Sequence, residues 1–258
     1  MSLRFRPFAA VLIAGALTLP SAITAGAQSI TSDQRGEIEK IIREYLLSHP
    51  ELLQDVMVEL EKRQTAAEAE KHRNAVKEHA EEIFNSPRQV TLGNPQGDVA
   101  IVEFFDYNCG YCKRAMGDML ELIKDDPKLK FVLKEFPVLG EGSVQAAQVA
   151  AAVRMQDKTG GKKYLEFHQK LLNSRGQVDK ARALAAAKEA GFDVARLEKD
   201  MASDEVRAQL EESMKLAEAL GLNGTPSYVV GPEVVVGAVG IKTLKERVNN
   251  ARCGQATC

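Results

Sequence analysis

Residues 102–116 read VEFFDYNCGYCKRAM, and this stretch decides how the rest of the chain is interpreted. The run DVAIVEFFDY, residues 98–107, is apolar and β-prone and predicts a buried strand. The residues from Cys112 onward favour a helix, and KLKFVLKEFPV at 128–138 predicts another strand. Two cysteines, Cys109 and Cys112, therefore stand at the junction of a strand and a helix, inside a strand–helix–strand crossover unit typical of parallel sheets.

The position at the start of a helix predicts a redox role for this pair. Unpaired backbone N–H groups and the helix dipole favour the thiolate of Cys109, which makes it a nucleophile. Cys112, one turn further, can then attack a mixed disulfide at Cys109 and release the partner. A covalent haem site is disfavoured because Lys113, not histidine, follows the second cysteine. A zinc site formed with a second cysteine pair and an inert staple stay open as alternatives.

The first residues predict export. Residues 1–27 combine two early arginines, an apolar core at 8–19 and the small-residue pattern Ala25-Gly26-Ala27. We expect a signal peptide that is cleaved before Gln28 and a periplasmic mature protein. An uncleaved membrane anchor is the alternative, but the apolar core is shorter than the roughly 20 residues that a spanning helix needs. We expect no membrane span in the mature form.

Composition narrows the class of protein. Without residues 1–27 the chain keeps 32 basic and 36 acidic residues, a formal charge of −4, so nothing indicates binding to nucleic acid. A hydrophobic content of 45% is enough for a core. Four cysteines are too few for a disulfide-rich scaffold, and they form two local pairs, Cys109 with Cys112 and Cys253 with Cys258.

The pattern of apolar and charged residues at 28–86 predicts an oligomerisation segment followed by a linker helix. Apolar residues recur at helical spacing on two short helices that are separated at 48–50, and beyond Leu60 the chain is charged or alanine-rich up to about Phe84. Short helices cannot bury such a face alone, so we expect self-association; folding back onto the chain's own domain is the alternative. The face comprises Ile38, Ile41, Ile42, Tyr45, Leu46, Leu52, Leu53, Val56, Met57 and Leu60.

Residues 87–258 predict one α/β domain. Short strands are expected at 88–92, 227–230 and 233–237, and a last helix at 241–251. A long helical block separates the early strands from the late ones. We therefore expect one sheet, interrupted by a helical insertion at about 141–222.

The motifs EFFDYNCGYC at 103–112 and GTPSYVVG at 224–231, together with the helical insertion, closely resemble the thioredoxin-fold proteins of the DsbA type. This resemblance implies a thioredoxin fold with an inserted helical domain and thiol:disulfide exchange as the activity. It implies that Pro226 is cis and that the backbone of Thr225 faces the cysteines and pairs with an extended substrate. Without the resemblance, an ordinary trans turn at Pro226 stays open.

Glu103 matches the acidic position that the family keeps beneath its active pair. Burial would raise the pKa of this carboxyl and let it exchange a proton with Cys112. A water-exposed position at the sheet edge is the alternative, and Lys134 is a candidate charge partner. His168 is expected to be a helix-packing or surface residue.

Two further resemblances concern activity and assembly. Gly110 and Tyr111 between the cysteines, with Thr225, resemble the disulfide isomerases of the DsbC type; with Pro226 they are the expected substrate-binding residues. Residues 42–64, IREYLLSHPELLQDVMVELEKRQ, resemble the oligomerisation segment of the ScsC (suppressor of copper sensitivity) proteins, some of which are trimers. We expect a homo-oligomer, a trimer rather than a dimer, that reshuffles disulfides of misfolded exported proteins and is kept reduced by a membrane reductase of the DsbD type.

Cys253 and Cys258 predict a structural disulfide that closes a small loop and pins the tail, with a second redox or copper-binding pair as the alternative. Two other functions stay open. One is a disulfide oxidase of the DsbA type, and the other is a copper-tolerance protein that binds Cu(I) through Cys109 and Cys112. Apart from that copper site we expect no metal, and no cofactor beyond the redox-active disulfide.

Overall fold

The computed structural model describes residues 31–258, so the predicted signal peptide lies outside the described residues. The chain divides into two compact units between Glu59 and Leu60, within helix α2 (Glu51–Glu78). In the first unit, helix α1 (Ser32–Ser48) starts at Thr31 with a capping box that Gln34 completes. No residue of α1 is buried.

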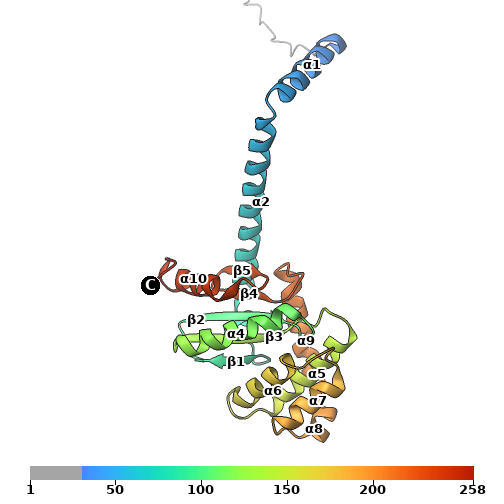
Figure 1. The fold of residues 1–258 in the computed structure, drawn as a ribbon, viewed down its shortest axis with the longest axis vertical. Coiled ribbons are helices and arrows are strands. Elements are labelled where there is room, and N and C mark those ends of the chain that lie inside the picture. The colour runs from blue at the N-terminus through green and yellow to red at the C-terminus, as the bar shows by residue number, and fades with distance from the viewer. Residues whose placement is uncertain (1–30) are drawn as a thin grey trace, which may run out of the picture. The chain divides into compact units, whose positions relative to one another are not determined.

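The second unit is built on a five-stranded mixed sheet with the order β1-β3-β2-β4-β5 (Figure 1). Strands β2 and β3 are parallel and are joined by the crossover helix α4 (Gly110–Asp125), as the sequence predicts, whereas the other pairs are antiparallel. The strands are β1 (Val90–Gly93), β2 (Val99–Phe105), β3 (Leu129–Glu135), β4 (Ser227–Val230) and β5 (Glu233–Val236).

The helical insertion lies between β3 and β4. It contains α5 (Glu141–Gln156), α6 (Lys162–Leu172), α7 (Lys180–Glu189), α8 (Val194–Asp200) and α9 (Asp204–Ala219). Figure 1 shows α5 to α8 gathered in one group of yellow-green to orange helices. The last helix, α10 (Gly240–Cys253), follows β5. The insertion spans the range expected from the sequence.

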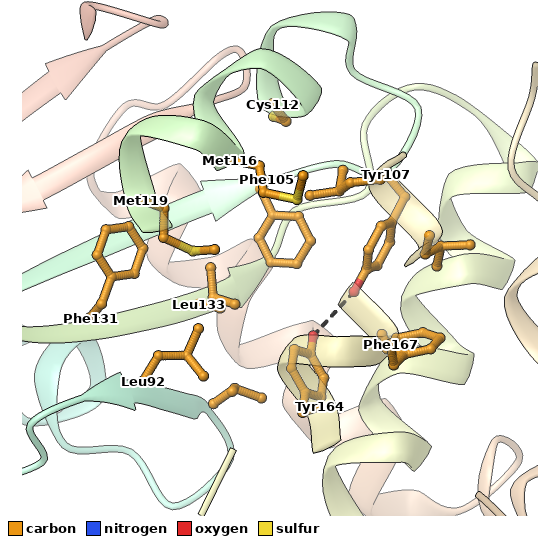
Figure 2. Close-up of a cluster of buried hydrophobic side chains, with 14 of the residues drawn as sticks. Leu92, Phe105, Tyr107, Cys112, Met116, Met119, Phe131, Leu133, Tyr164 and Phe167 are labelled. Atoms are coloured by element: carbon orange, nitrogen blue, oxygen red, sulfur yellow. Dashed lines mark hydrogen bonds between the residues drawn. The ribbon is translucent and has the colours of Figure 1, made fainter. Parts of the chain in front are cut away.

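The two faces of the sheet carry separate cores. Alternation along β2 places Ile101 and Phe105 in the core shared with α4, α10 and the insertion, which Figure 2 shows around Cys112 and Met116. The intervening Val102 and Phe104 belong to the core on the opposite face.

The core on that opposite face begins earlier in the sequence than we expected. It contains Val76 of α2 and Ile83 of α3 (Ala80–Phe84). The composition predicted a solvated linker up to residue 86, whereas the compact unit starts at Leu60. A mostly charged helix can still bury a narrow face, which in α2 consists of Val76 alone. Composition does not reveal so narrow a face.

Within residues 31–258, no helix is long and apolar enough to cross a membrane.

Candidate active site

Cys109 and Cys112 lie at the start of α4, directly after the turn that ends β2. Cys109 is the N-cap residue with an extended backbone, and its N–H donates to the carbonyl oxygen of Asp106 at 3.0 Å. Both cysteines are free thiols. Both are buried, Cys109 at 6% exposed and Cys112 at 1% exposed, so Cys109 is the more accessible of the two thiols. This difference in access is what a two-step exchange through an attacking and a resolving thiol needs.

The loop before β4 completes the surroundings of the first thiol. The bond between Thr225 and Pro226 is cis, as the resemblance implied. The Cys109 Sγ donates to the carbonyl oxygen of Thr225 at 3.1 Å, although 116 residues separate them. Thr225 is half-buried, so this contact between the thiol and the Thr225 backbone lies close to the protein surface. The fold therefore brings together the two motifs that carried the resemblance.

Glu103 lies on the face of the sheet that α4 covers, in register with Leu133 and Tyr228. It is 4% exposed, which excludes the water-exposed alternative. Burial, with a smaller contribution from the charge of Asp118, raises the pKa of Glu103 to about 8. Burial also raises the pKa of the Cys112 thiol, and the charge of Glu103 raises it further.

Lys134 is not the charge partner of Glu103. It is in register with Phe104, so its side chain belongs to the opposite face of the sheet. There its Nζ donates to the carbonyl oxygen of Glu82 at 2.7 Å and to Glu212 at 3.4 Å. Burial lowers the pKa of Lys134 to about 8. A one-residue difference in register decides which face a strand residue occupies, so the expectation that placed Lys134 beside Glu103 on the neighbouring strand is wrong.

Gly110 and Tyr111 form the exposed first turn of α4. The Tyr111 side chain is 60% exposed, and the Arg114 guanidinium lies over its ring at 4.3 Å from the centroid. Such a contact orients an exposed aromatic ring. The structure thus places an ordered aromatic surface next to Cys109.

Two known protein families match parts of this chain. A family described as "DSBA-like thioredoxin domain" matches residues 100–249, more than half of the chain. The chain belongs to the DsbA-like thioredoxin family. A second family, described as "Copper resistance protein ScsC N-terminal domain", matches residues 34–67. The resemblances to the DsbA-type proteins and to the ScsC amino-terminal segment are confirmed.

Solved structures agree with the assignment. A thioredoxin-like oxidoreductase from Silicibacter pomeroyi is 45% identical, with a TM-score of 0.63 over 67% of this chain and 96% of that one. A linker-deletion mutant of ScsC from Proteus mirabilis is 25% identical, with a TM-score of 0.65 over 88% of this chain and 99% of that one. The carboxyl-terminal unit is therefore a thiol:disulfide oxidoreductase domain of the DsbA/ScsC type.

Sequence relatives have different lengths. The probable disulfide bond formation protein D of Bacillus cereus is 25% identical over 61% of this chain and 76% of that protein. The Na⁺/H⁺ antiporter NhaA 1 of Salinispora arenicola is 26% identical over 65% of this chain, but the chain spans only 25% of the length of that antiporter. The antiporter match is thus confined to a minor part of a longer protein.

The DsbA-like domain also contains functional candidates that the sequence did not single out. Asp106 and Asn108 hold the turn before Cys109, through contacts to the helical insertion that are described below. Asp and Asn before a helix are common turn residues, so their presence was visible in the sequence, but their distant partners were not.

His168 is buried, in a polar cluster between the sheet and the insertion (Figure 2 shows the two tyrosines). Tyr107 Oη lies 3.2 Å from both Tyr164 Oη and His168 Nδ1, and Tyr164 donates to Glu135 at 2.8 Å. Burial lowers the pKa of His168 to about 3, so the ring is neutral. Its place is that of a helix-packing residue, as expected.

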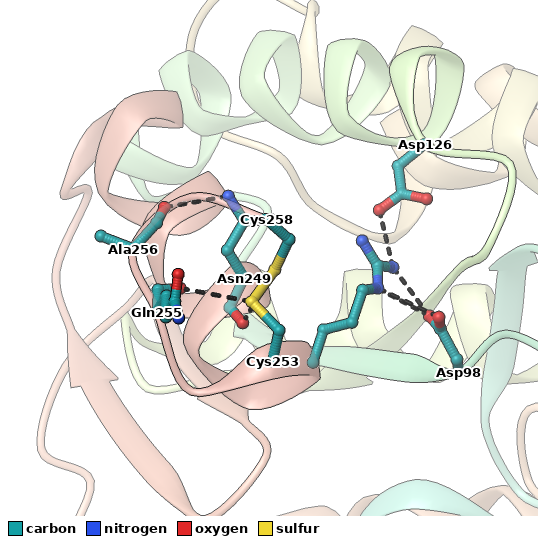
Figure 3. The surroundings of a disulfide bond; sticks show 8 residues. Asp98, Asp126, Asn249, Cys253, Gln255, Ala256 and Cys258 are labelled. Atoms are coloured by element: carbon teal, nitrogen blue, oxygen red, sulfur yellow. Dashed lines mark hydrogen bonds and ion pairs between the residues drawn. A yellow bond between two sulfur atoms is a disulfide. The ribbon is translucent and has the colours of Figure 1, made fainter.

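Cys253, the last residue of α10, forms a disulfide with Cys258 (Figure 3). Both residues are exposed, and Asn249 Nδ2 donates to the carbonyl oxygen of Ala256 at 2.9 Å to close the loop. Because this pair is bonded to itself, a zinc site shared by both cysteine pairs is excluded. In the described part of the chain, no group of three or more His, Cys, Asp or Glu side chains is arranged to hold a metal ion.

Proposed function

We propose that this chain is a periplasmic disulfide isomerase or reductase that acts on misfolded exported proteins through Cys109 and Cys112, and that it works as a homo-oligomer, a trimer in preference to a dimer. The observation that carries the proposal is the apolar face of the amino-terminal helices. The reactive pair itself is equally compatible with an oxidase, so assembly is what favours isomerisation.

Most large apolar side chains of α1 and of the start of α2 are exposed. Nine of those between residues 38 and 58 are 43–73% exposed in the single chain, whereas Leu46 and Leu52 are partly buried. A continuous apolar face of this kind is unfavourable in water and is typical of an interface. A second copy offers the same face, and the ScsC amino-terminal family matches this segment. We infer that these helices join several copies, so that several reactive thiols serve one substrate.

The chemistry follows from the unequal access of the two thiols. The Cys109 thiolate attacks a substrate disulfide; a bond forms between Cys109 Sγ and one substrate sulfur, and the other substrate sulfur leaves as a thiolate. When a different substrate cysteine attacks that mixed disulfide, Cys109 returns as a thiolate, and no net electrons are transferred. This is isomerisation.

Cys112 resolves a mixed disulfide that no substrate cysteine attacks. It attacks Cys109 Sγ, releases the substrate as a thiol, and leaves the disulfide between Cys109 and Cys112. The charge of Glu103 reaches this thiol, and the ionised form of Glu103, a minority at pH 7 because its pKa is about 8, is placed to accept the proton that Cys112 must lose. A membrane reductase of the DsbD type would then supply two electrons and two protons to restore both thiols.

Substrate binding is proposed at the surface around Cys109. An extended chain would pair with the backbone of Thr225, held by the cis bond to Pro226, and would contact Gly110 and the Tyr111 ring. Backbone pairing is insensitive to side-chain identity, which suits a protein that acts on many unfolded chains.

The test compares reactivation of a scrambled-disulfide protein by the chain starting at Gln28 and by a variant carrying Ile41→Lys and Val56→Lys. Gln54→Lys is the matched control, because it adds a lysine at an exposed polar position of α2. Point variants are preferable to deleting residues 28–84, since that deletion removes Val76 and Ile83 from the core.

We expect the parent chain and the control to be oligomers by light scattering and to reactivate the substrate, and the double variant to be a monomer with reduced activity. An active monomeric variant would contradict the role of the helices. Absence of reactivation, combined with rapid oxidation of reduced substrate or tight Cu(I) binding, would replace the isomerase by the oxidase or the copper-binding function.

A further inference from the structure

The residue directly before the reactive cysteine is bound to the helical insertion. Asn108 Oδ1 accepts the Val178 N–H at 2.7 Å, and Asn108 Nδ2 donates to the Val178 carbonyl oxygen at 2.9 Å. The same Nδ2 donates to Ser143 Oγ of α5 at 3.0 Å. One side-chain amide thus satisfies both backbone groups of a fully buried residue 70 positions away.

Asp106 holds the other end of the turn. Its carboxyl group accepts from Ser143 Oγ at 2.7 Å and from the backbone N–H groups of Asn108, Val138 and Leu139 at 2.8, 2.9 and 3.0 Å. Ser143 therefore contacts both turn residues. The turn that places Cys109 is held by α5 and by the loop before it, as well as by the chain's own backbone.

The loop between α6 and α7, residues 173–179, contacts both sides of the cysteine pair. It meets Asn108 before Cys109, and Lys113 Nζ, just after Cys112, donates to the carbonyl oxygen of Ser174 at 3.1 Å. The approach of α5 to this loop is close, because a Cβ at Gly142 would lie 2.6 Å from the Val178 carbonyl oxygen. The loop and the active-site turn are thus packed with little freedom.

We propose that Asn108 is a positioning residue, through which the helical insertion sets how readily the Cys109–Cys112 disulfide is reduced. In the reduced protein Cys109 and Cys112 are free thiols that lie within interaction distance of each other. The contacts of Asn108 hold the turn that carries Cys109 in this place, so less conformational freedom is lost when the disulfide forms. By linkage the contacts of Asn108 therefore favour the disulfide over the dithiol.

The quantity to measure is the equilibrium in which two glutathione molecules reduce the Cys109–Cys112 disulfide to two thiols and leave as oxidised glutathione. The redox state of this pair is read from alkylated peptides that contain both residues, so that the Cys253–Cys258 bond does not interfere. Asn108→Ala is expected to shift the equilibrium constant toward the dithiol by about fivefold, because the turn that carries Cys109 loses three hydrogen bonds and gains freedom that disulfide formation must then remove.

Asn94→Ala is the matched control. The Asn94 amide also bonds to backbone, donating to the Pro127 carbonyl oxygen at 3.0 Å and accepting from the Gln96 N–H at 2.9 Å, but in a loop that precedes β2. Its equilibrium constant should stay within about twofold of the parent. Ser143→Ala removes contacts to the same turn from α5 and should shift the constant in the same direction by a smaller factor.

An unchanged constant for folded Asn108→Ala, or a shift toward the disulfide, overturns the proposal. If Asn108→Ala does not fold, as judged by circular dichroism, Ser143→Ala decides: a shift toward the dithiol supports the proposal, and any other result overturns it. An equal shift in Asn94→Ala also overturns it, because any loosened loop would then have the same effect. The result is independent of whether the protein is an isomerase or an oxidase.

Discussion

Replacing Glu103 by glutamine isolates the charge of the carboxyl buried beneath Cys112. Burial raises the pKa of this group from 4.5 to about 8 in the folded protein. Between these two values the unfolded chain has released the proton and the folded chain still holds it. The free energy of unfolding of the parent therefore falls as the pH rises from 4.5 to about 8, by about 1.4 kcal/mol per pH unit.

Glutamine has nearly the same shape as glutamate and does not ionise, so the free energy of unfolding of the variant does not fall with pH for this reason. Between pH 5 and pH 7 the stability of Glu103→Gln should therefore rise by about 2–3 kcal/mol relative to the parent. The assay is urea unfolding of the reduced protein at pH 5, 6, 7 and 8, followed by circular dichroism because the chain has no tryptophan.

Glu166→Gln is the control, since Glu166 is exposed on α6 and loses little hydration on folding. Its stability difference from the parent should stay constant across the same pH range. A difference for Glu103→Gln that also stays constant to within about 1 kcal/mol would show that the carboxyl is not held in a buried, protonated state, and the proposed proton exchange between Glu103 and Cys112 would fail.

Three other outcomes follow from the geometry. Cys112→Ser should accumulate mixed disulfides with substrate on non-reducing gels because the resolving thiol is lost, and a variant that releases substrate at the parent rate contradicts the assigned order of attack. Gly142→Ala should lower the free energy of unfolding in urea by about 1–3 kcal/mol, because its Cβ would meet a backbone oxygen at 2.6 Å. Gly117→Ala, in open space on α4, should raise it by up to about 1 kcal/mol. Equal effects of the two substitutions would refute the close approach at Gly142. Replacing both Cys253 and Cys258 by serine should lower stability by at most about 2 kcal/mol and leave thiol exchange unchanged, since the loop is short and exposed; loss of exchange would reveal a redox role.

The local elements of this protein were predictable from the sequence alone. Apolar runs located the strands, helical spacing located the amino-terminal helices, and the cysteine spacing located the reactive pair. These signals work because each is set by the backbone preferences and burial of neighbouring residues. The cis bond at Pro226 needed a resemblance as well, because the sequence around a proline does not by itself decide its isomer.

Tertiary structure decided which distant groups meet. Strand register placed Glu103 beneath Cys112 and Lys134 on the opposite face, and packing drew Val76 into the core. The insertion supplied both hydrogen-bonding groups of Val178 to Asn108. Such contacts depend on how whole elements pack against one another, and that is determined by the burial of the entire core, which no local stretch of sequence records.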